Sequence, residues 1–375
     1  MIGKPDAHKL IPNIITTKQQ QYTNMHDYLE ELNEVQRQAV TTTDGPVLVV
    51  AGPGSGKTRV LTYRIAHLIQ KGTAPWEILA LTFTNKSAKE MKERISKVVG
   101  DRAKSLWAGT FHSVFCKILR MEADKIGYPN SFTIYDSQDS NSLINTIIRE
   151  MGLDPKKYNT NTVKARISSA KSNLLSPAGY AQNEAWITDD RQKGIAEVAH
   201  IYKRYAARCK KSGAMDFDDL LYQLYLLLHK NPDGVREKYQ RKFKYVLVDE
   251  FQDTNSLQYS ILRLLVEYEG SPNNICAVGD DAQSIYGFRG ATIQNILDFE
   301  NDFKALQTFK LEQNYRSTEH IVQAANKVIT RNSKQIPKTI WSNKGAGQKI
   351  KVVQAMSDLE EGRRVAGMIV EQKSR

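Results

Sequence analysis

Short apolar runs alternate with stretches of helical hydrophobic spacing in two separate parts of the chain. Five runs are short and apolar enough to be buried strands, at 47–50, 78–83, 106–109, 245–250 and 275–280. Apolar residues recur at helical spacing after these runs. Such alternation predicts a parallel α/β sheet with right-handed crossover connections.

The pattern between the third and fourth runs is different, because it is almost entirely helical. We expect residues 110–217 to form a helical subdomain inserted into an α/β domain made of residues 25–109 and 218–307. Residues 1–24 are polar and lack the apolar segment of a signal peptide, which predicts a loose polar arm.

The charge of the chain indicates the kind of partner. Lys and Arg number 53 against 41 Asp and Glu, a net charge of +12. This excess favours a polyanion such as nucleic acid, although a generic basic surface gives the same number. The three cysteines are far apart in the sequence, which is typical of a reducing, cytoplasmic environment, and no apolar run is long enough for a membrane span.

The segment "AGPGSGKT" (51–58) follows the first strand and opens a helix. Its glycines allow a tight turn with inward N–H groups, Lys57 can reach the β- and γ-phosphates, and the Thr58 hydroxyl can ligate Mg²⁺. Ala51 stands where the usual pattern begins with Gly. A glycine-rich turn with a chance lysine is the alternative, but strand, loop and helix in register favour phosphate binding.

The segment "YVLVDEFQD" places Asp249 and Glu250 at the end of a buried strand. Ligands of parallel sheets bind at such carboxyl ends. We expect Asp249 to hold Mg²⁺ and Glu250 to orient and deprotonate an attacking water. The alternative is an exposed, acidic strand end.

A further strand end, "AVGDDAQSIYGFRGA", combines polar and aromatic residues. Asp280 and Gln283 stand where a γ-phosphate could be sensed. Tyr286, Phe288 and Arg289 follow within a few residues, as in a base-stacking platform. The two rings could instead belong to the core.

From about Tyr28 to its end, the chain resembles the UvrD/Rep-type superfamily 1 DNA helicases. Seven segments match in order: "LNEVQRQAV", "AGPGSGKT", "LTFTNKSAKEM", "GTFHS", "VDEFQDT", "GDDAQSIYGFRGA" and "LEQNYRST". Ala at the first phosphate-loop position is usual in this family. The resemblance implies that Gln36 reads the adenine edge and that Arg37 lies against the ring. It also implies that Tyr315 stacks on adenine and that Arg316 acts as an arginine finger.

The resemblance assigns further residues to the two ligands. It implies catalytic roles for Glu250, Gln283 and Arg316, and Mg²⁺ ligation by Thr58 and Asp249. The implied phosphate-loop contacts to nucleotide are Gly52, Gly54, Ser55, Gly56, Lys57, Thr58 and Arg59. The implied DNA contacts are Phe83, Thr84, Asn85, Thr110, Phe111, His112, Tyr286, Phe288 and Arg289. Phe288 departs from the Trp that is frequent in relatives.

The implied fold is a P-loop NTPase with a RecA-like parallel sheet, in which residues 308–375 begin a second motor domain. The implied activity is ATP- and Mg²⁺-dependent 3′-to-5′ DNA unwinding in repair or replication restart, on single strands and their junctions with duplex, with unidentified protein partners. Family members are longer. We therefore expect an N-terminal portion that binds nucleotide and DNA, turns ATP over slowly and does not unwind alone.

Three alternatives stay open at this stage. The parent protein could be a helicase–nuclease subunit whose nuclease lies beyond Arg375. The phosphate loop could serve a small-molecule kinase or an AAA-type ATPase, although the charge, the stacking segment and the helical insertion argue against both. The chain could also hold DNA and nucleotide without turnover.

Overall fold

The computed structural model describes residues 27–287, 290–333 and 335–374. The expected polar arm at 1–24 and the expected DNA contacts Phe288 and Arg289 lie outside the described residues. No helix in the described ranges combines the length and the apolar character that crossing a membrane requires.

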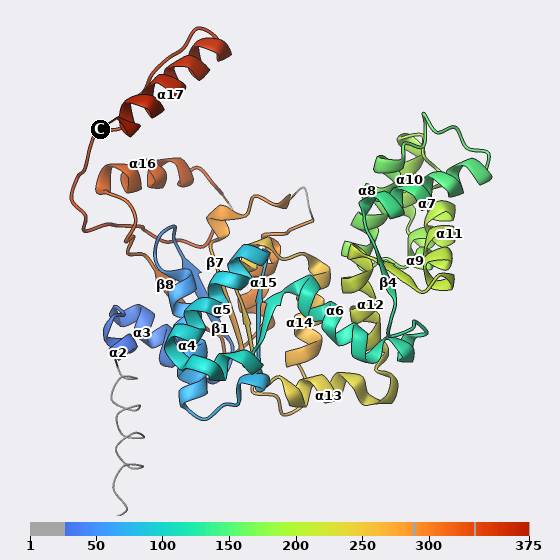
Figure 1. Ribbon diagram of the computed structural model, residues 1–375, viewed down its shortest axis with the longest axis horizontal. Coiled ribbons are helices and arrows are strands. Elements are labelled where there is room, and N and C mark those ends of the chain that lie inside the picture. Colours follow the sequence, from blue (N-terminus) through green and yellow to red (C-terminus); the bar gives the residue numbers. More distant parts are fainter. Residues whose placement is uncertain (1–26, 288–289, 334, 375) are drawn as a thin grey trace, which may run out of the picture.

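Six parallel strands form the central sheet, in the order β3-β2-β6-β7-β1-β8 (Figure 1). They are β1 (Val47–Ala51), β2 (Ile78–Thr82), β3 (Trp107–Thr110), β6 (Tyr245–Val248), β7 (Ile275–Gly279) and β8 (Gln307–Leu311). All residues of β1, β2, β3 and β7 are buried, which agrees with their mostly apolar consecutive residues. The predicted α/β class with a parallel, RecA-like sheet is confirmed.

Helices cover both faces of the sheet, and alternate strand residues face opposite cores. Val47 and Val49 of β1 belong to one core, whereas Leu48 and Val50 belong to the other. The first core is closed by α2 (Asp27–Glu30), α3 (Glu34–Thr41), α4 (Lys57–Gln70) and α5 (Asn85–Val99). The second is closed by α6 (Phe111–Glu122), α12 (Phe217–Lys230), α13 (Val235–Lys242), α14 (Ser256–Val266) and α15 (Gln294–Asp302).

Short 3-10 helices connect several of these elements. They are η1 (Pro75–Glu77), η2 (Gly100–Ser105), η3 (Ala123–Ile126), η4 (Pro232–Gly234), η5 (Phe251–Asp253) and η6 (Asp281–Gln283). Two of them, η5 and η6, directly follow the carboxyl ends of β6 and β7, where polar residues gather.

A second lobe stands beside the sheet, in green and yellow-green in Figure 1. It contains α7 (Ser137–Glu150), α8 (Thr160–Ser172), α9 (Pro177–Gln182), α10 (Glu184–Gln192) and α11 (Val198–Lys211). These helices share a separate apolar core that includes Ile144, Ile167 and Tyr202. Two short parallel strands, β4 (Thr133–Tyr135) and β5 (Ala214–Asp216), stand at the entry and exit of the lobe and were not predicted.

A buried ion cluster joins this lobe to the domain that contains the sheet. Lys171 of α8 places its Nζ 2.7 Å from Oδ2 of Asp216 and 2.9 Å from Oδ1 of Asp219, at the start of α12. The Tyr205 hydroxyl donates to Asp216 (2.8 Å). Although burial alone lowers the pKa of Lys171, the two carboxylates raise it well above its usual value. Lys171 is therefore charged.

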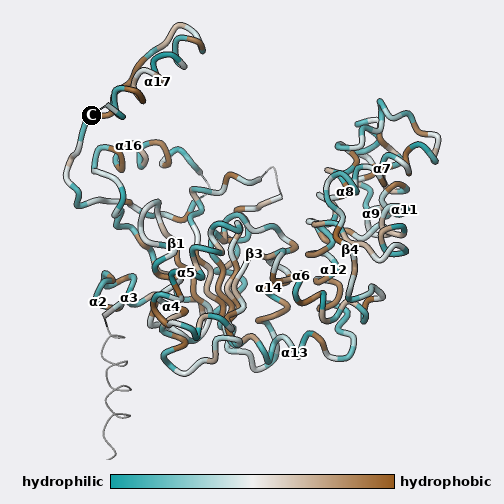
Figure 2. The backbone as a smooth tube through the Cα atoms, in the orientation of Figure 1, coloured by the Kyte–Doolittle hydropathy of each residue, from teal (hydrophilic) through white to brown (hydrophobic). Residues whose placement is uncertain are grey.

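β8 pairs along its whole length with the outer edge of β1, whose backbone groups need partners, and the expected domain boundary at residue 308 lies within this strand. Residues 349–355 form neither a helix nor a strand. The helices described after β8 are α16 (Glu319–Ile329) and α17 (Asp358–Lys373). Figure 2 shows apolar residues on α17, yet none of its described side chains is buried.

Candidate functional site

Glycines with left-handed backbone angles shape the loop between β1 and α4. Gly54 has φ 67° and Gly56 has φ 93°. A Cβ at Gly54 would lie 2.7 Å from Cβ of Arg316, and one at Gly56 would lie 2.9 Å from Nε2 of Gln36. Gly56 is the N-cap of α4 and supplies no side-chain hydrogen bond, so an anion can accept from the first-turn N–H groups.

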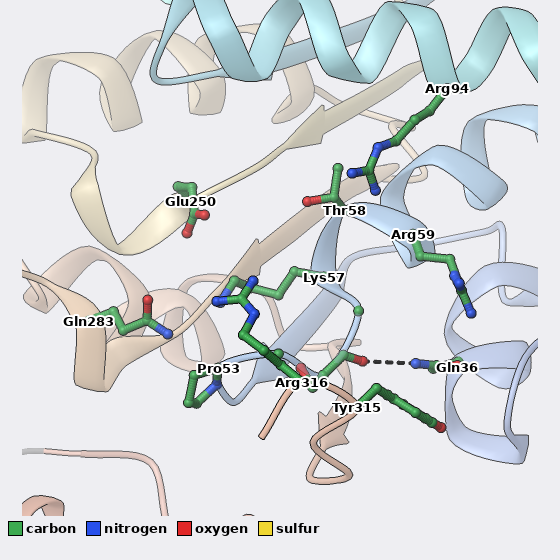
Figure 3. Close-up of a pocket in the computed structure, with 13 residues that line it drawn as sticks. Gln36, Pro53, Lys57, Thr58, Arg59, Arg94, Glu250, Gln283, Tyr315 and Arg316 are labelled. Carbon is green, nitrogen blue, oxygen red and sulfur yellow. Dashed lines mark hydrogen bonds between the residues drawn. The ribbon is translucent and has the colours of Figure 1, made fainter. Parts of the chain in front are cut away.

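A cavity of about 520 Å³ opens over this loop, and we call it the nucleotide cleft (Figure 3). Its lining residues come from α3, α5 and the segments that follow β1, β6, β7 and β8: Gln36, Pro53, Gly54, Ser55, Gly56, Lys57, Thr58, Arg59, Arg94, Glu250, Gln283, Tyr315 and Arg316. Segments that are far apart in the sequence therefore meet at one edge of the sheet.

The acidic wall of the cleft follows β6. Asp249 is buried, and its Oδ1 accepts a hydrogen bond from the Glu250 N–H (3.1 Å). Glu250 has φ 51°, a costly angle for a residue with a side chain. Its carboxylate faces the cleft in Figure 3, and Gln252 Nε2 donates to its Oε2 (3.0 Å). Asp253 lies nearby with a buried Oδ1 that has no hydrogen-bond partner.

Gln36 and Tyr315 line the end of the cleft beside α3 (Figure 3). The side-chain amide of Gln36 is held on both sides, because its Nε2 donates to the Ser55 carbonyl (2.8 Å) and its Oε1 accepts from the Asn33 N–H (3.2 Å). The Tyr315 hydroxyl accepts from Asn33 Nδ2 (2.8 Å). An adenine at this end would meet a fixed amide and a half-exposed ring.

Two expected nucleotide contacts lie outside the cleft lining. The Arg37 guanidinium donates to the carbonyls of Leu29 and Leu32 (3.2 and 3.3 Å), which directs it along the chain between α2 and α3. The Gly52 N–H donates to the Leu311 carbonyl (3.1 Å) at the end of β8. Arg37 and Gly52 therefore make hydrogen bonds to backbone near the cleft and do not line it.

Asn314 ties the segment after β8 to the phosphate loop. Its Nδ2 donates to the Pro53 carbonyl (2.7 Å), and its Oδ1 accepts from the N–H groups of Arg316 and Ser317 (2.8 and 2.7 Å). In Figure 3 the Arg316 side chain extends toward Lys57. Cationic side chains therefore line the cleft from two segments, Lys57 and Arg59 from the start of α4 and Arg316 from the segment after β8.

A second cavity of about 490 Å³ brings together two of the three segments that were expected to contact DNA, 83–85 and 110–112. We call it the aromatic groove. It is lined by Phe83, Thr84, Asn85, Thr110, His112, Ser113, Cys116, Ile134, Phe217 and Leu220. Thr84 and Thr110 are N-caps, of α5 and α6, whose hydroxyls accept from Ser87 N–H (3.1 Å) and Ser113 N–H (3.2 Å).

Aromatic side chains from separate elements meet at this groove. The His112 and Phe217 rings have centroids 6.0 Å apart, and those of Phe83 and Tyr286 are 5.2 Å apart. Phe217 is 56% exposed. Burial lowers the pKa of His112, although Asp218 opposes the shift, so the imidazole is neutral near pH 7. The groove offers rings for stacking instead of fixed charge.

Phe111 corrects the expected DNA-binding set. Its ring is 2% exposed and packs edge-on against Phe115, with centroids 5.6 Å apart, in the core that contains α6. The ring has no surface to offer a base. Its place in the "GTFHS" segment is explained by core packing, because it is the first residue of a helix whose apolar face turns inward.

Comparison with protein families identifies this arrangement. The UvrD/REP helicase N-terminal domain matches residues 32–304, and the UvrD-like helicase C-terminal domain matches residues 309–375. The chain belongs to the UvrD/Rep helicase family. The family expectation from the seven segments is confirmed.

Curated relatives in this helicase family include ATP-dependent DNA helicase PcrA from several bacteria. The chain is 46% identical to the Staphylococcus aureus protein over 338 residues, which are 90% of this chain and 45% of the relative. It is 46% identical to the Bacillus subtilis protein over 342 residues (91% and 45%). The Staphylococcus epidermidis protein is 44% identical over 347 residues (92% and 46%). The chain spans about half the length of these relatives.

Burial and close carboxylates raise pKa values along the acidic wall of the cleft. Burial raises the pKa of Asp249 to about 7, and the neighbouring Glu250 adds to the rise. Burial and Glu250 also raise the pKa of Asp253 to about 6. Within the described residues, no three His, Cys, Asp or Glu side chains converge as a complete metal site. Mg²⁺ commonly takes one or two protein oxygens plus water and phosphate, so Thr58 and Asp249 fit it.

Sequence reasoning missed several residues of these sites, and three of them bear on the chemistry. Arg94 on α5 lines the nucleotide cleft, Gln252 hydrogen bonds to Glu250, and Phe217 lines the aromatic groove. Gln252 stands within "VDEFQD", where a buried amide two residues after a carboxylate was a usable signal. Arg94 and Phe217 gave no signal, because the sequence does not reveal which helix face borders the cleft.

Proposed function

We propose that this chain carries the ATP-hydrolysing and DNA-contacting part of an ATP-dependent 3′-to-5′ DNA helicase. The observation that carries the proposal is the nucleotide cleft, where the phosphate loop meets Glu250, Gln283 and Arg316. The relatives named ATP-dependent DNA helicase support the same activity.

In the proposed reaction, the loop N–H groups and Lys57 hold the β- and γ-phosphates of ATP. Thr58 and Asp249 would ligate Mg²⁺, which when bound neutralises charge on these phosphates. Glu250 accepts a proton from the attacking water, and Gln252 holds the carboxylate in place through its 3.0 Å hydrogen bond. Gln283 and Arg316 would meet charge that develops on the transferred phosphoryl group.

The aromatic groove is the proposed path of single-stranded DNA. Phe217, His112 and the Phe83–Tyr286 pair offer rings on which bases stack with little sequence preference. Tyr286 follows Gln283 by three residues. A shift of Gln283 on loss of the γ-phosphate would therefore move a groove ring. Repair or replication restart, on single strands and their junctions with duplex, is the proposed setting.

The domain division is also a proposal. The sheet with its helices would be the first motor domain, the helical lobe an inserted arm, and the residues after β8 part of a second motor domain. Since α17 buries none of its described side chains, this helix adds little rigid support for coupled movement of the domains. We propose that the 375-residue chain binds ATP and DNA, hydrolyses ATP slowly and does not unwind duplex.

Steady-state ATPase assays with and without single-stranded DNA test the proposal. Lys57→Ala should abolish both nucleotide binding and turnover. Glu250→Gln should keep binding and lose turnover, because it removes a base and no phosphate contact. Near-normal ATPase in Lys57→Ala would show that the phosphate site lies elsewhere, and strand separation by this chain would contradict the proposal that it does not unwind duplex.

A further inference from the structure

A strap of residues 336–342 crosses the edge of the sheet at which the nucleotide cleft opens. It runs beside the segment after β8, where the Trp341 N–H donates to Glu312 (3.0 Å) and the Trp341 carbonyl accepts from Asn314 (2.7 Å). The Ile340 side chain fills the space beside Gly52, where an added Cβ would come within 2.1 Å of it. The strap is thus packed directly on the phosphate loop.

Lys338 of this strap is buried against two carboxylates that follow β7. Its side chain is 6% exposed, and its Nζ pairs with Asp281 and lies 3.1 Å from Oδ1 of Asp280. Both carboxylates are fully buried, and the Ile336 N–H donates to Asp281 (2.7 Å). Within the described residues, Lys338 is the only cation in ion-pair contact with either of them. The Asp280 carboxylate therefore faces Lys338, and Gln283 is the residue of this segment that lines the cleft.

Asp280 connects Lys338 to two residues that line the nucleotide cleft, Gln283 and Glu250. Its Oδ2 accepts from Gln283 Nε2 (2.6 Å), which holds the side chain that lines the cleft. Its N–H donates to Gln252 Oε1 (3.0 Å), and Gln252 Nε2 donates to Glu250. Gly279 makes this bridge possible, because a Cβ there would lie 2.6 Å from Gln252 Oε1.

We propose that Lys338 is a positioning residue. It keeps the side chains of Gln283 and Glu250 oriented toward the nucleotide cleft, and it couples the presence of a γ-phosphate in the cleft to the conformation of the strap. This inference rests on the proposed function, since it assumes that the cleft binds ATP. Lys338 does not line the cleft. Its loss would leave two buried carboxylates without a counter-charge, and they would draw water or move apart. Gln283 would then lose the partner that orients its amide.

Binding of two fluorescent nucleotides by the 375-residue chain tests this inference. The probes are the methylanthraniloyl forms of ADP and of AMP-PNP, with Mg²⁺ and single-stranded DNA present. The dissociation constant of the ADP probe divided by that of the AMP-PNP probe measures how much the γ-phosphate strengthens binding. A hydrogen bond to a charged group corresponds to about 10- to 150-fold in affinity, so Lys338→Ala should lower the ratio by at least about 10-fold with little change in ADP affinity.

Three further variants separate positioning from a general structural role. Gln283→Ala should lower the ratio by a similar factor, and the double variant should fall no further, because both act through one contact. Lys338→Arg should recover part of the ratio, since it keeps the charge. Lys327→Ala is the matched control: Lys327 lies exposed on α16, in no ion pair among the described residues, and its loss should leave the ratio unchanged.

Each outcome supports or overturns one idea. A wild-type chain that binds neither probe overturns the proposed function together with this inference. A wild-type chain that binds both probes equally overturns only the γ-phosphate sensing. A folded Lys338→Ala variant with an unchanged ratio overturns the role of Lys338 and leaves the proposed function standing. If that variant does not fold, hydrogen exchange of the wild type decides: AMP-PNP must protect residues 336–342 more than ADP does, and equal protection overturns the inference.

Discussion

Phe217 and Phe111 form a matched pair for testing the proposed DNA groove. Both rings begin helices that pack on the same core, yet Phe217 is 56% exposed and Phe111 is 2% exposed. Phe217 faces His112 at the aromatic groove, whereas Phe111 packs on Phe115. Truncation of each ring to Ala should therefore affect a different property.

The magnitudes follow from this exposure. A base stacked on an aromatic ring is worth about 1–3 kcal/mol, so Phe217→Ala should weaken binding of single-stranded DNA by about 5- to 150-fold. Its free energy of unfolding should change by less than about 1 kcal/mol, because the ring is mostly in water already. Phe111→Ala removes a buried ring and should cost about 3–5 kcal/mol of stability.

Fluorescence anisotropy with a labelled oligothymidylate, repeated over a salt series, measures the binding side. The slope of affinity against salt should be unchanged in Phe217→Ala, because no phosphate contact is removed. Thermal unfolding of the same samples measures stability. Phe217→Tyr keeps a ring and should bind DNA nearly as well as wild type. If Phe217→Ala instead binds DNA normally and melts early, the ring serves the fold and the groove is not the DNA path.

Three other predictions concern buried charge and the phosphate loop. The pKa of Asp249 is about 7 in the folded protein, above the ordinary 3.8; the folded state then holds an extra proton, and stability falls as the pH rises through this window. Asp249→Asn should accordingly raise the Tm at pH 8 without nucleotide and abolish Mg²⁺-dependent nucleotide binding, and an unchanged or lower Tm would contradict this sign. Lys171→Met leaves two buried carboxylates unpaired and should cost about 3–5 kcal/mol in urea unfolding, whereas Lys193→Met breaks an exposed pair and should cost under about 1 kcal/mol; equal costs would refute the ion cluster as a brace. Gly56→Ala places a Cβ 2.9 Å from Gln36 Nε2 at φ 93°, so it should weaken nucleotide binding about 10-fold or more in a fluorescence titration, and normal affinity would show that the loop tolerates a side chain.

The sequence by itself determined five of the six strands of the sheet and the position of the phosphate loop, whereas β8 was not predicted. Consecutive apolar residues such as Val47–Val50 must be buried on both faces, which specifies a central parallel strand. Lys57 and Thr58 were expected at a phosphate site because such a site depends on the adjacent turn and helix start, all within a few residues, and both residues line the cleft. Asp249 and Glu250 could be placed at a strand end for a similar reason, since both directly follow a buried strand. Local features of this kind are fully contained in sequence spacing.

Only the tertiary structure decided which side chains face the sites. Phe111 turned out to be core and Phe217 exposed, because the direction of a helix face depends on what packs against it. Arg37 bonds to backbone carbonyls near its own helix instead of lining the cleft. Lys338 lies far along the chain from Asp280 and Asp281, and their ion pairs arise only because the strap returns across the strand ends. Long-range packing sets these contacts, and no pattern of neighbouring residues records it.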